Sequence, residues 1–302
     1  MTARLRGVLP VLVIVVLVAA LPWLLPSFLT FQCAFAGAYA IAILGLIVLT
    51  GANGQVSLGH GAFMAAGGYL LAILARSAGW PPELALPAAG LVGFALGGGV
   101  GLVALRLTGA YLALATFALA VAVPPLIKRF AWITGGAQGV TLAFVRDSKV
   151  LYLESWSMLA LLLLLTAWLL RGRVGRSLRA LRDNEIAAIS FGIDPVRYKA
   201  FAFALSAAYA GIAGALLATA TAYVSPDTFG LQLSLTLLIG AVIGGLDSLW
   251  GAMLGGLVIE FLPLLAQTVN VAASSLVYGI ALILVTILVP GGIAGALRTI
   301  RR

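Results

Sequence analysis

Long apolar runs separated by short polar stretches dominate the hydrophobicity pattern of this chain. Runs such as Val11–Leu21 and Leu159–Leu165 do not alternate with polar residues, which excludes the strand pattern of an outer-membrane barrel. A stretch of roughly 20 apolar residues can cross a bilayer as a helix. The pattern predicts an all-α integral membrane protein with about ten transmembrane helices, at residues 8–29, 33–50, 58–75, 85–105, 110–127, 156–170, 200–223, 233–246, 251–267 and 273–289.

Three of these segments need a closer reading. A cleaved signal peptide usually has an apolar core of 7–15 residues, so the longer segment 8–29 favours a retained first span. Segments 58–75 and 233–246 are short or interrupted by glycine. They can cross the bilayer fully, or they can be re-entrant or discontinuous helices.

Small residues recur at intervals of four in the pairs Gly93/Gly97, Gly97/Gly101, Gly240/Gly244 and Gly251/Gly255. Such pairs let helix backbones approach closely in lipid. Packing within one bundle is the favoured interpretation, ahead of a pore lining or a subunit interface.

Composition leaves no room for a second domain. The chain of 302 residues is 63% hydrophobic and only 9% charged. The longest stretches that are less apolar, 128–155 and 171–199, are each shorter than 30 residues. Independent domains usually have at least about 50 residues. We therefore expect a single transmembrane domain over 1–302. The phosphate-binding pattern G-x-x-x-x-G-K-[ST] is absent, and one cysteine and one histidine argue against a metal site.

The basic residues predict the orientation. With the N-terminus in the cytoplasm, five of the 18 Lys and Arg residues fall on the outer side, namely Arg76, Lys128, Arg129, Arg146 and Lys149. The other 13 fall on the inner side, as positive-inside topology requires. Both termini are expected in the cytoplasm, and the net charge of +9 needs no nucleic-acid partner.

The cytoplasmic segment 171–199 holds the densest group of charges. We expect one amphipathic helix over 177–191, with Ser177 as N-cap and Gly192 as its C-terminal stop. Arg179–Asp183 and Arg182–Glu185 are spaced to pair along it. Asp194-Pro195 has the pattern of an N-cap followed by proline at the first position of the next helix. The helix could lie on acidic lipid headgroups or dock onto a cytoplasmic partner.

Three stretches make the sequence resemble a known family. Glu185-Ile186-Ala187-Ala188 with Gly192 resembles the E-A-A…G coupling segment of bacterial ABC importer permeases, apart from the inserted Ile186. Residues 179–216 and 49–63 are similar to permeases of branched-chain amino-acid importers, the LivH/LivM family, and most of all to its LivM type. Residues 134–139, TGGAQG, resemble the outer loop of that family. The likeness runs from about residue 35 to 295.

The resemblance implies a type II ABC importer permease fold with a cytoplasmic coupling helix in 171–199, located in a bacterial inner membrane. It implies four partners besides lipid: a related LivH-like permease, two ATPase subunits and a periplasmic binding protein. ATP and Mg would sit on the ATPases, leaving no cofactor and no catalytic residue in this chain. The residues implied in coupling are Arg176, Arg179, Asp183, Glu185, Ala187, Ala188 and Gly192. An importer of urea or short amides is the alternative within the family.

Polar residues within the apolar regions are candidates for the translocation path. Asn53, Gln55, Ser57 and His60 lie in a glycine-rich break, which can line the path or form an inner-side turn that satisfies its own backbone. Glu260 is the one charge inside a predicted span. Such a carboxylate can couple transport to protons or be a buried structural group, and the second interpretation is favoured.

The outer loop and the rival functions complete the sequence picture. Gly135, Gly136, Gln138 and Gly139 open the outer loop and can contact a binding protein or simply connect two spans. A self-contained secondary transporter is the rival from another class, but it usually has more than one ionisable residue at mid-membrane. An ion channel and an enzyme are disfavoured, because neither a ring of acidic residues nor a nucleophile–base pair is apparent.

Overall fold

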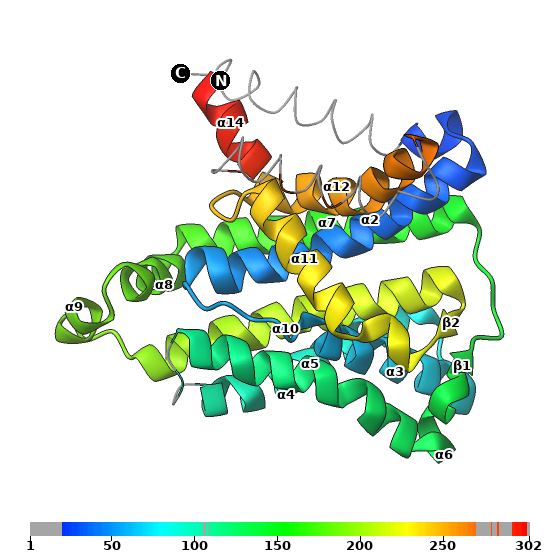
Figure 1. Cartoon of the computed structure of the whole chain (residues 1–302), viewed down its shortest axis with the longest axis horizontal. Coiled ribbons are helices and arrows are strands. Elements are labelled where there is room, and N and C mark those ends of the chain that lie inside the picture. The colour runs from blue at the N-terminus through cyan, green and yellow to red at the C-terminus, as the bar shows by residue number, and fades with distance from the viewer. Residues whose placement is uncertain are drawn as a thin grey trace.

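The computed structural model describes residues 20–104, 107, 109–269, 279, 283 and 292–300. Its long helices run side by side in an elongated bundle (Figure 1). In chain order the helices are α2 (Ser27–Leu46), the π-helix η1 (Ile47–Ala52) that continues it, α3 (His60–Ala78), α4 (Pro82–Ala104), α5 (Ala110–Arg129), α6 (Ala131–Thr134), the 3-10 helix η2 (Gly136–Gln138), α7 (Ser148–Arg171), α8 (Arg173–Asp183), α9 (Glu185–Ser190), α10 (Pro195–Thr221), the 3-10 helix η3 (Pro226–Phe229), α11 (Leu231–Gly244), α12 (Leu249–Val269) and α14 (Gly292–Ile300).

The prediction of an all-α membrane protein is confirmed. Among the described residues eight helices are long and apolar enough to cross a bilayer, and they match eight of the ten predicted segments. Segments 8–29 and 273–289 lie outside the described residues, except for 20–29, 279 and 283. The described strands are β1 (Val140–Thr141) and β2 (Tyr223–Val224), which pair antiparallel with Val140 opposite Val224.

The two weak segments differ from each other. Segment 58–75 forms the continuous helix α3. Segment 233–246 forms the short helix α11, which η3 precedes after a break at Gly230. The break at Gly230 precedes segment 233–246, and Gly240 and Gly244 within the segment do not interrupt the helix.

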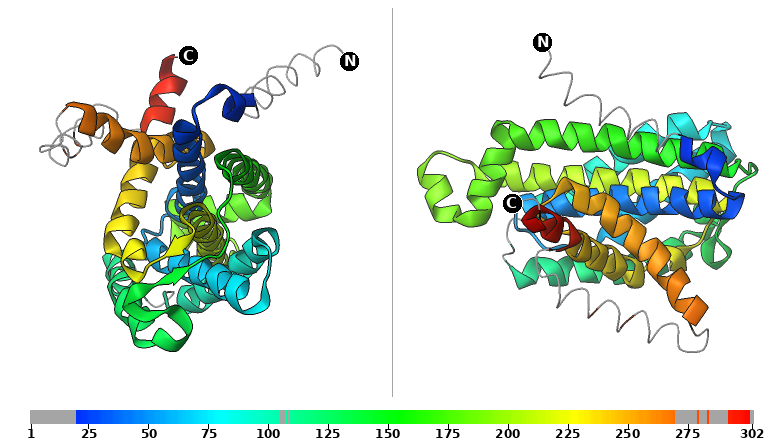
Figure 2. Two further views of the ribbon diagram at one scale, coloured as in Figure 1. Left: turned by 90° about the vertical axis from the view of Figure 1, so that its right-hand side faces the viewer. Right: turned by 90° about the horizontal axis from the view of Figure 1, so that it is seen from above.

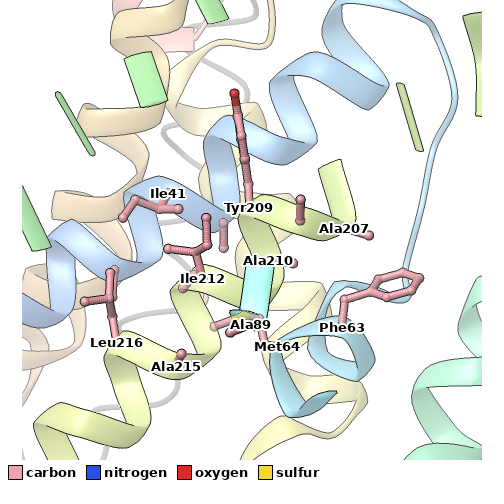
Figure 3. Close-up of a cluster of buried hydrophobic side chains, with 14 of the residues drawn as sticks. Ile41, Phe63, Met64, Ala89, Ala207, Tyr209, Ala210, Ile212, Ala215 and Leu216 are labelled. Atoms are coloured by element: carbon pink, nitrogen blue, oxygen red, sulfur yellow. The ribbon is translucent and has the colours of Figure 1, made fainter. Parts of the chain in front are cut away.

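Helix α10 is the centre of the bundle. It packs against α2, α3 and α4 and is buried over most of its length (Figure 2). Close-packed side chains from these helices fill the space around it, among them Ile41, Met64, Ala89 and Ile212 (Figure 3). The residues of α10 that make these contacts are mostly small, so the neighbouring helices come close to its backbone.

Glycines set the separation between the helices. A Cβ on Gly67 would collide with the Gly211 carbonyl, and one on Gly214 with the Met64 backbone. Gly93, Gly97 and Gly101 of α4 all face α10. Because lipid offers no hydrophobic drive for helix pairing, this close approach supplies the packing contacts.

The glycine pairs of the last two spans have the same role. Gly240 and Gly244 of α11 face Gly255 and Gly251 of α12, with backbone against backbone. The prediction that the glycine pairs pack helices within one bundle is therefore confirmed for all four pairs.

The connections gather at the two ends of the bundle. Helices α8 and α9 project from one end, whereas α6 and the β1–β2 pair lie at the other (Figure 1). The ion pair between Lys128 and Asp227, 2.7 Å long, joins α5 to η3 at the β1–β2 end. Connections at both ends of the bundle are expected when successive helices cross the bilayer in opposite directions.

We expect Gly211→Ala to destabilise the bundle. The new Cβ would lie 2.5 Å from the carbonyl oxygen of Ala89, and overpacking of this kind costs about 1–3 kcal/mol. The measurement is the thermal unfolding temperature of the purified chain in detergent. Gly99→Ala is the matched control, because a Cβ there meets nothing within 4 Å. Equal unfolding temperatures for the two variants would contradict the prediction.

Candidate functional site

The charged segment 171–199 contains two short helices, α8 and α9, and not the single helix predicted over 177–191. The chain breaks at Asn184, whose φ of −158° and ψ of 104° are extended. The Asn184 side chain accepts a hydrogen bond from the Ala187 amide at 3.0 Å and so caps α9. Asparagine is among the best N-cap residues, which explains the break. Ser177 lies inside α8, whose N-cap is Gly172, so the prediction for Ser177 was wrong.

The end of α9 was predicted correctly. Gly192 has a φ of +79°, and its amide donates to the Ile189 carbonyl while Ile193 donates to Ala188. These two bonds make a Schellman motif, in which glycine avoids the strain of a left-handed residue. Asp194 then caps α10 by accepting from the amides of Val196 and Arg197, with Pro195 at the first position.

Helix α9 lies beyond the end of the bundle (Figure 1), and it carries exposed apolar side chains. Ile186 and Phe191 are 81% and 87% exposed, and Ile189 is exposed beside them. Ala187 and Gly192 are exposed too. Ala188 is only 3% exposed, so it faces the chain itself and offers no surface to a partner.

The predicted ion pairs of this segment are wrong, because these side chains bind other partners. Glu185 pairs with Lys199 of α10 at 2.7 Å and not with Arg182. Arg179 donates to the Leu170 carbonyl instead of pairing with Asp183. Arg176, also exposed, donates to the Arg171 carbonyl at 3.4 Å.

Arg182 is the functional candidate that the sequence did not single out. Its side chain binds Asp183 at 3.2 Å, Asp247 at 3.0 Å and the carbonyl of Gly51. Partial burial lowers the pKa of Arg182, but the hydrogen bonds and charges of Asp183 and Asp247 outweigh it and raise the pKa overall. Gly51 and Asp247 belong to other parts of the chain, so no local sequence signal could identify them as partners.

The glycine-rich break between η1 and α3 begins beside Arg182 of α8, which Gly54 contacts, and runs from there into the bundle. Leu58 donates its amide to Thr116 of α5 at 2.9 Å. The Asn53 side chain donates to Gln55 at 2.8 Å, and Ser57 accepts from the Gly59 amide. Asn53 and Ser57 are buried, whereas Gln55 is half-buried. The irregular backbone is thus satisfied by protein, as membrane depth requires.

His60 is the first residue of α3, and it contacts α10 at Ser206. Its Nε2 is 2.8 Å from the hydroxyl of Ser206, and that hydroxyl donates to the Gly45 carbonyl at 2.7 Å. Since Ser206 has one proton to give, and gives it to Gly45, His60 must donate from Nε2. Nδ1 is buried without a hydrogen-bond partner. His60 therefore holds α3 against α10 and α2.

Glu260 lines a cavity of about 480 Å³ between α2, η3, α11 and α12. Tyr39, Thr228, Gln232 and Thr236 supply polar atoms to this cavity, and Ile259, Leu233, Pro263 and Leu264 supply apolar walls. Asp227 also lines it and is held by Lys128. The cavity thus combines a carboxylate, hydrogen-bonding groups and an aliphatic surface.

Glu260 is not the one charge inside a spanning helix. Helix α7 begins at Ser148, well before the predicted start of its span at 156, and so includes Glu154. Glu154 forms an ion pair with Arg146, which also pairs with Glu83. The ion pair of Glu154 with Arg146 is compatible with a helix α7 that begins before the apolar run.

The outer-loop residues build a tight turn. Gly135, Gly136 and Gly139 all have positive φ, between 62° and 71°. The Tyr223 hydroxyl donates to the Gln138 carbonyl at 2.7 Å and fixes the turn to β2. The Gln138 residue is exposed, while Gly136 is buried. Among the described residues there is no group of three His, Cys, Asp or Glu that could hold a metal.

Comparison with known proteins gives a consistent picture. The family described as "branched-chain amino acid transport system / permease component" matches residues 28–286. The chain is similar to the high-affinity branched-chain amino acid transport system permease protein LivM of Salmonella typhimurium, with 34% identity over 286 residues that cover 84% of this chain and 67% of that protein. LivM of Escherichia coli is equally similar. LivH of Escherichia coli, a permease protein of the same kind of system, is 28% identical over 85% of this chain and 91% of its own length. No solved structure gives a significant match.

Proposed function

The chain belongs to the family of permease components of branched-chain amino acid transport systems, and from that membership we propose that it is the membrane subunit of an ABC importer. In this proposal it carries branched-chain amino acids from the periplasm to the cytoplasm. It has no ATPase activity of its own, and the hydrolysis of ATP takes place on separate subunits. The protein crosses the inner membrane several times, with both termini in the cytoplasm.

The exposed surface of α9 is the observation that carries the proposal. Isoleucine and phenylalanine side chains projecting from the end of a bundle are typical of a protein–protein contact. The basic residues Arg176 and Arg179 lie exposed on the preceding helix α8, which places positive charge beside the apolar tip. We propose that this surface docks into an ATPase subunit.

The remaining partners follow from the family. A second, LivH-like permease would lie beside this chain and complete the path, and a periplasmic binding protein would deliver the substrate to the β1–β2 end. The exposed Gln138 and the rigid glycine turn around it are our candidates for contact with the binding protein. ATP and Mg belong to the ATPases in this scheme.

We place the translocation path at the Glu260 cavity. Its carboxylate can meet the ammonium group of an amino acid, and its leucine, isoleucine and proline residues suit an aliphatic side chain. Asn53, Ser57 and His60 are buried and bonded within the chain, so their role in our proposal is to support the break. Gln55 is half-buried, accepts a hydrogen bond from Asn53 and does not line the Glu260 cavity.

The first test is uptake by the reconstituted complex. Purified with the permease, ATPases and binding protein encoded beside it, the chain should import leucine, isoleucine or valine into proteoliposomes only when ATP is present. A complex with hydrolysis-deficient ATPases is the control. Uptake without ATPases would indicate a secondary transporter, and selective uptake of urea or acetamide would indicate the alternative substrate class.

The second test concerns the α9 surface. Ile186→Asp and Phe191→Asp should each abolish co-purification of the ATPases, since a charge placed in an apolar contact loses its water without a partner. Val145→Asp is the matched control, because Val145 is 89% exposed and precedes α7 at the opposite end. Retention of the ATPases by both α9 variants would contradict the proposed docking surface.

The third test concerns Glu260. Glu260→Gln should lower the maximal rate of uptake about tenfold, the usual size of a lost hydrogen bond to a charged group. Glu260→Asp keeps the carboxylate and should restore part of the rate. Unchanged uptake in Glu260→Gln would show that the carboxylate is a structural group only.

A further inference from the structure

We infer that Arg182 is the positioning residue that transmits movement of the docking segment α8–α9 to the membrane helices that line the Glu260 cavity. The inference rests on the proposed function, because it concerns how ATP hydrolysis on a partner is coupled to transport. Arg182 lies in the last turn of α8, two residues before the break at Asn184. It is thus at the end of α8 that leads into the proposed docking tip.

One guanidinium nitrogen of Arg182 joins two distant segments. Its Nη1 donates both to the Gly51 carbonyl at 2.5 Å and to Asp247 Oδ1 at 3.0 Å. Gly51 lies in η1, the π-helical continuation of α2. Asp247 lies in the turn between α11 and α12. A single side chain therefore connects α8 with the inner ends of three membrane helices.

The stem of Arg182 is held as closely as its head. Gly54 has a φ of +74°, and a Cβ at this position would lie 2.9 Å from Arg182 Cγ. Gly51 in turn contacts the backbone carbonyl of Leu246, where a Cβ would collide. Residues 51–54 and 246–247 thus form one junction, and Arg182 lies across it.

The helices that meet at this junction are those that line the cavity. Tyr39 comes from α2, Gln232 and Thr236 from α11, and Glu260 from α12. A displacement of α8 would pull on η1 and on the α11–α12 turn together. The π-helical turn at η1 is a natural place for that movement, since such turns have strained hydrogen bonding and recur at functional sites.

The ion pair between Arg182 and Asp247 can also break and form again. The side chains of Arg182 and Asp247 are 34% and 80% exposed, so water can replace their ion pair at little cost. Such a pair adds little to stability. Its value lies in fixing the relative position of α8 and the junction.

The experiment uses the full importer complex in proteoliposomes and measures amino acid imported per ATP hydrolysed. Arg182→Gln should keep ATP hydrolysis that the binding protein stimulates, while import per ATP falls at least about fivefold, the lower end of typical coupling effects. Asp247→Asn should lower the same ratio by a smaller factor. The double variant should be no worse than Arg182→Gln, because both changes remove one link.

Arg197→Gln is the matched control and should leave the ratio unchanged. Arg197 lies at the same end of the bundle, is 86% exposed and pairs with Asp194 in its own turn. An unchanged ratio in Arg182→Gln would overturn the inference, as would an equal loss of ATP hydrolysis and import in an assembled complex. If Arg182→Gln fails to assemble, an unchanged ratio in Asp247→Asn overturns it. A wild-type complex without ATP-dependent amino acid uptake would instead refute the proposed function.

Discussion

Close contact between helix backbones is the constraint on which the rest of this structure depends. Lipid provides no hydrophobic drive for helices to associate, so packing has to come from van der Waals contact over small residues. Helix α10 meets α3 and α4 through Gly67, Gly211 and Gly93, where a methyl group would not fit. Helices α11 and α12 also pack backbone against backbone at glycines. The bundle is therefore built from helix pairs that cannot separate or slide without losing many contacts at once.

The same constraint decides where polar groups can lie. Inside the bundle most of them bond to other parts of the fold: the Ser206 hydroxyl links His60 Nε2 to the Gly45 carbonyl, and Thr166 bonds to Tyr209 between α7 and α10. Polarity that is free for partners is therefore found at the two ends and around the Glu260 cavity. This distribution is what makes the few charges of the chain informative.

Much of this could be predicted from the sequence, because spans, caps and glycine pairs are encoded locally. Gly192 and Asp194 end and begin helices through bonds to residues within five positions. The break at Asn184 had a local signal, its N-cap bond to Ala187, which the prediction of one helix missed. The burial of Ala188 and the partners of Arg182 could not be predicted, because each depends on where α8 and α9 lie against the rest of the chain. The place of the charged helical segment between two spans followed from sequence, but the side chains that it exposes and its contacts with the membrane helices did not.

Tight packing of the helices and an exposed contact between α8 and the helix ends have complementary roles in the proposed transporter. Helices whose backbones interlock through glycines respond to force as one body, so movement must enter at their ends, where the packing stops. The chain has irregular backbone at two such points, η1 and the turn 245–248, and Gly51 brings them into contact. Both points can adjust without disturbing the helix pairs behind them. A solvent-exposed arginine across that contact can shift them together, whereas a buried bond of the kind seen at His60 would resist the shift. In the proposed mechanism, the exposure of the Arg182–Asp247 ion pair is thus what suits it to a movement that has to be reversed in every transport cycle.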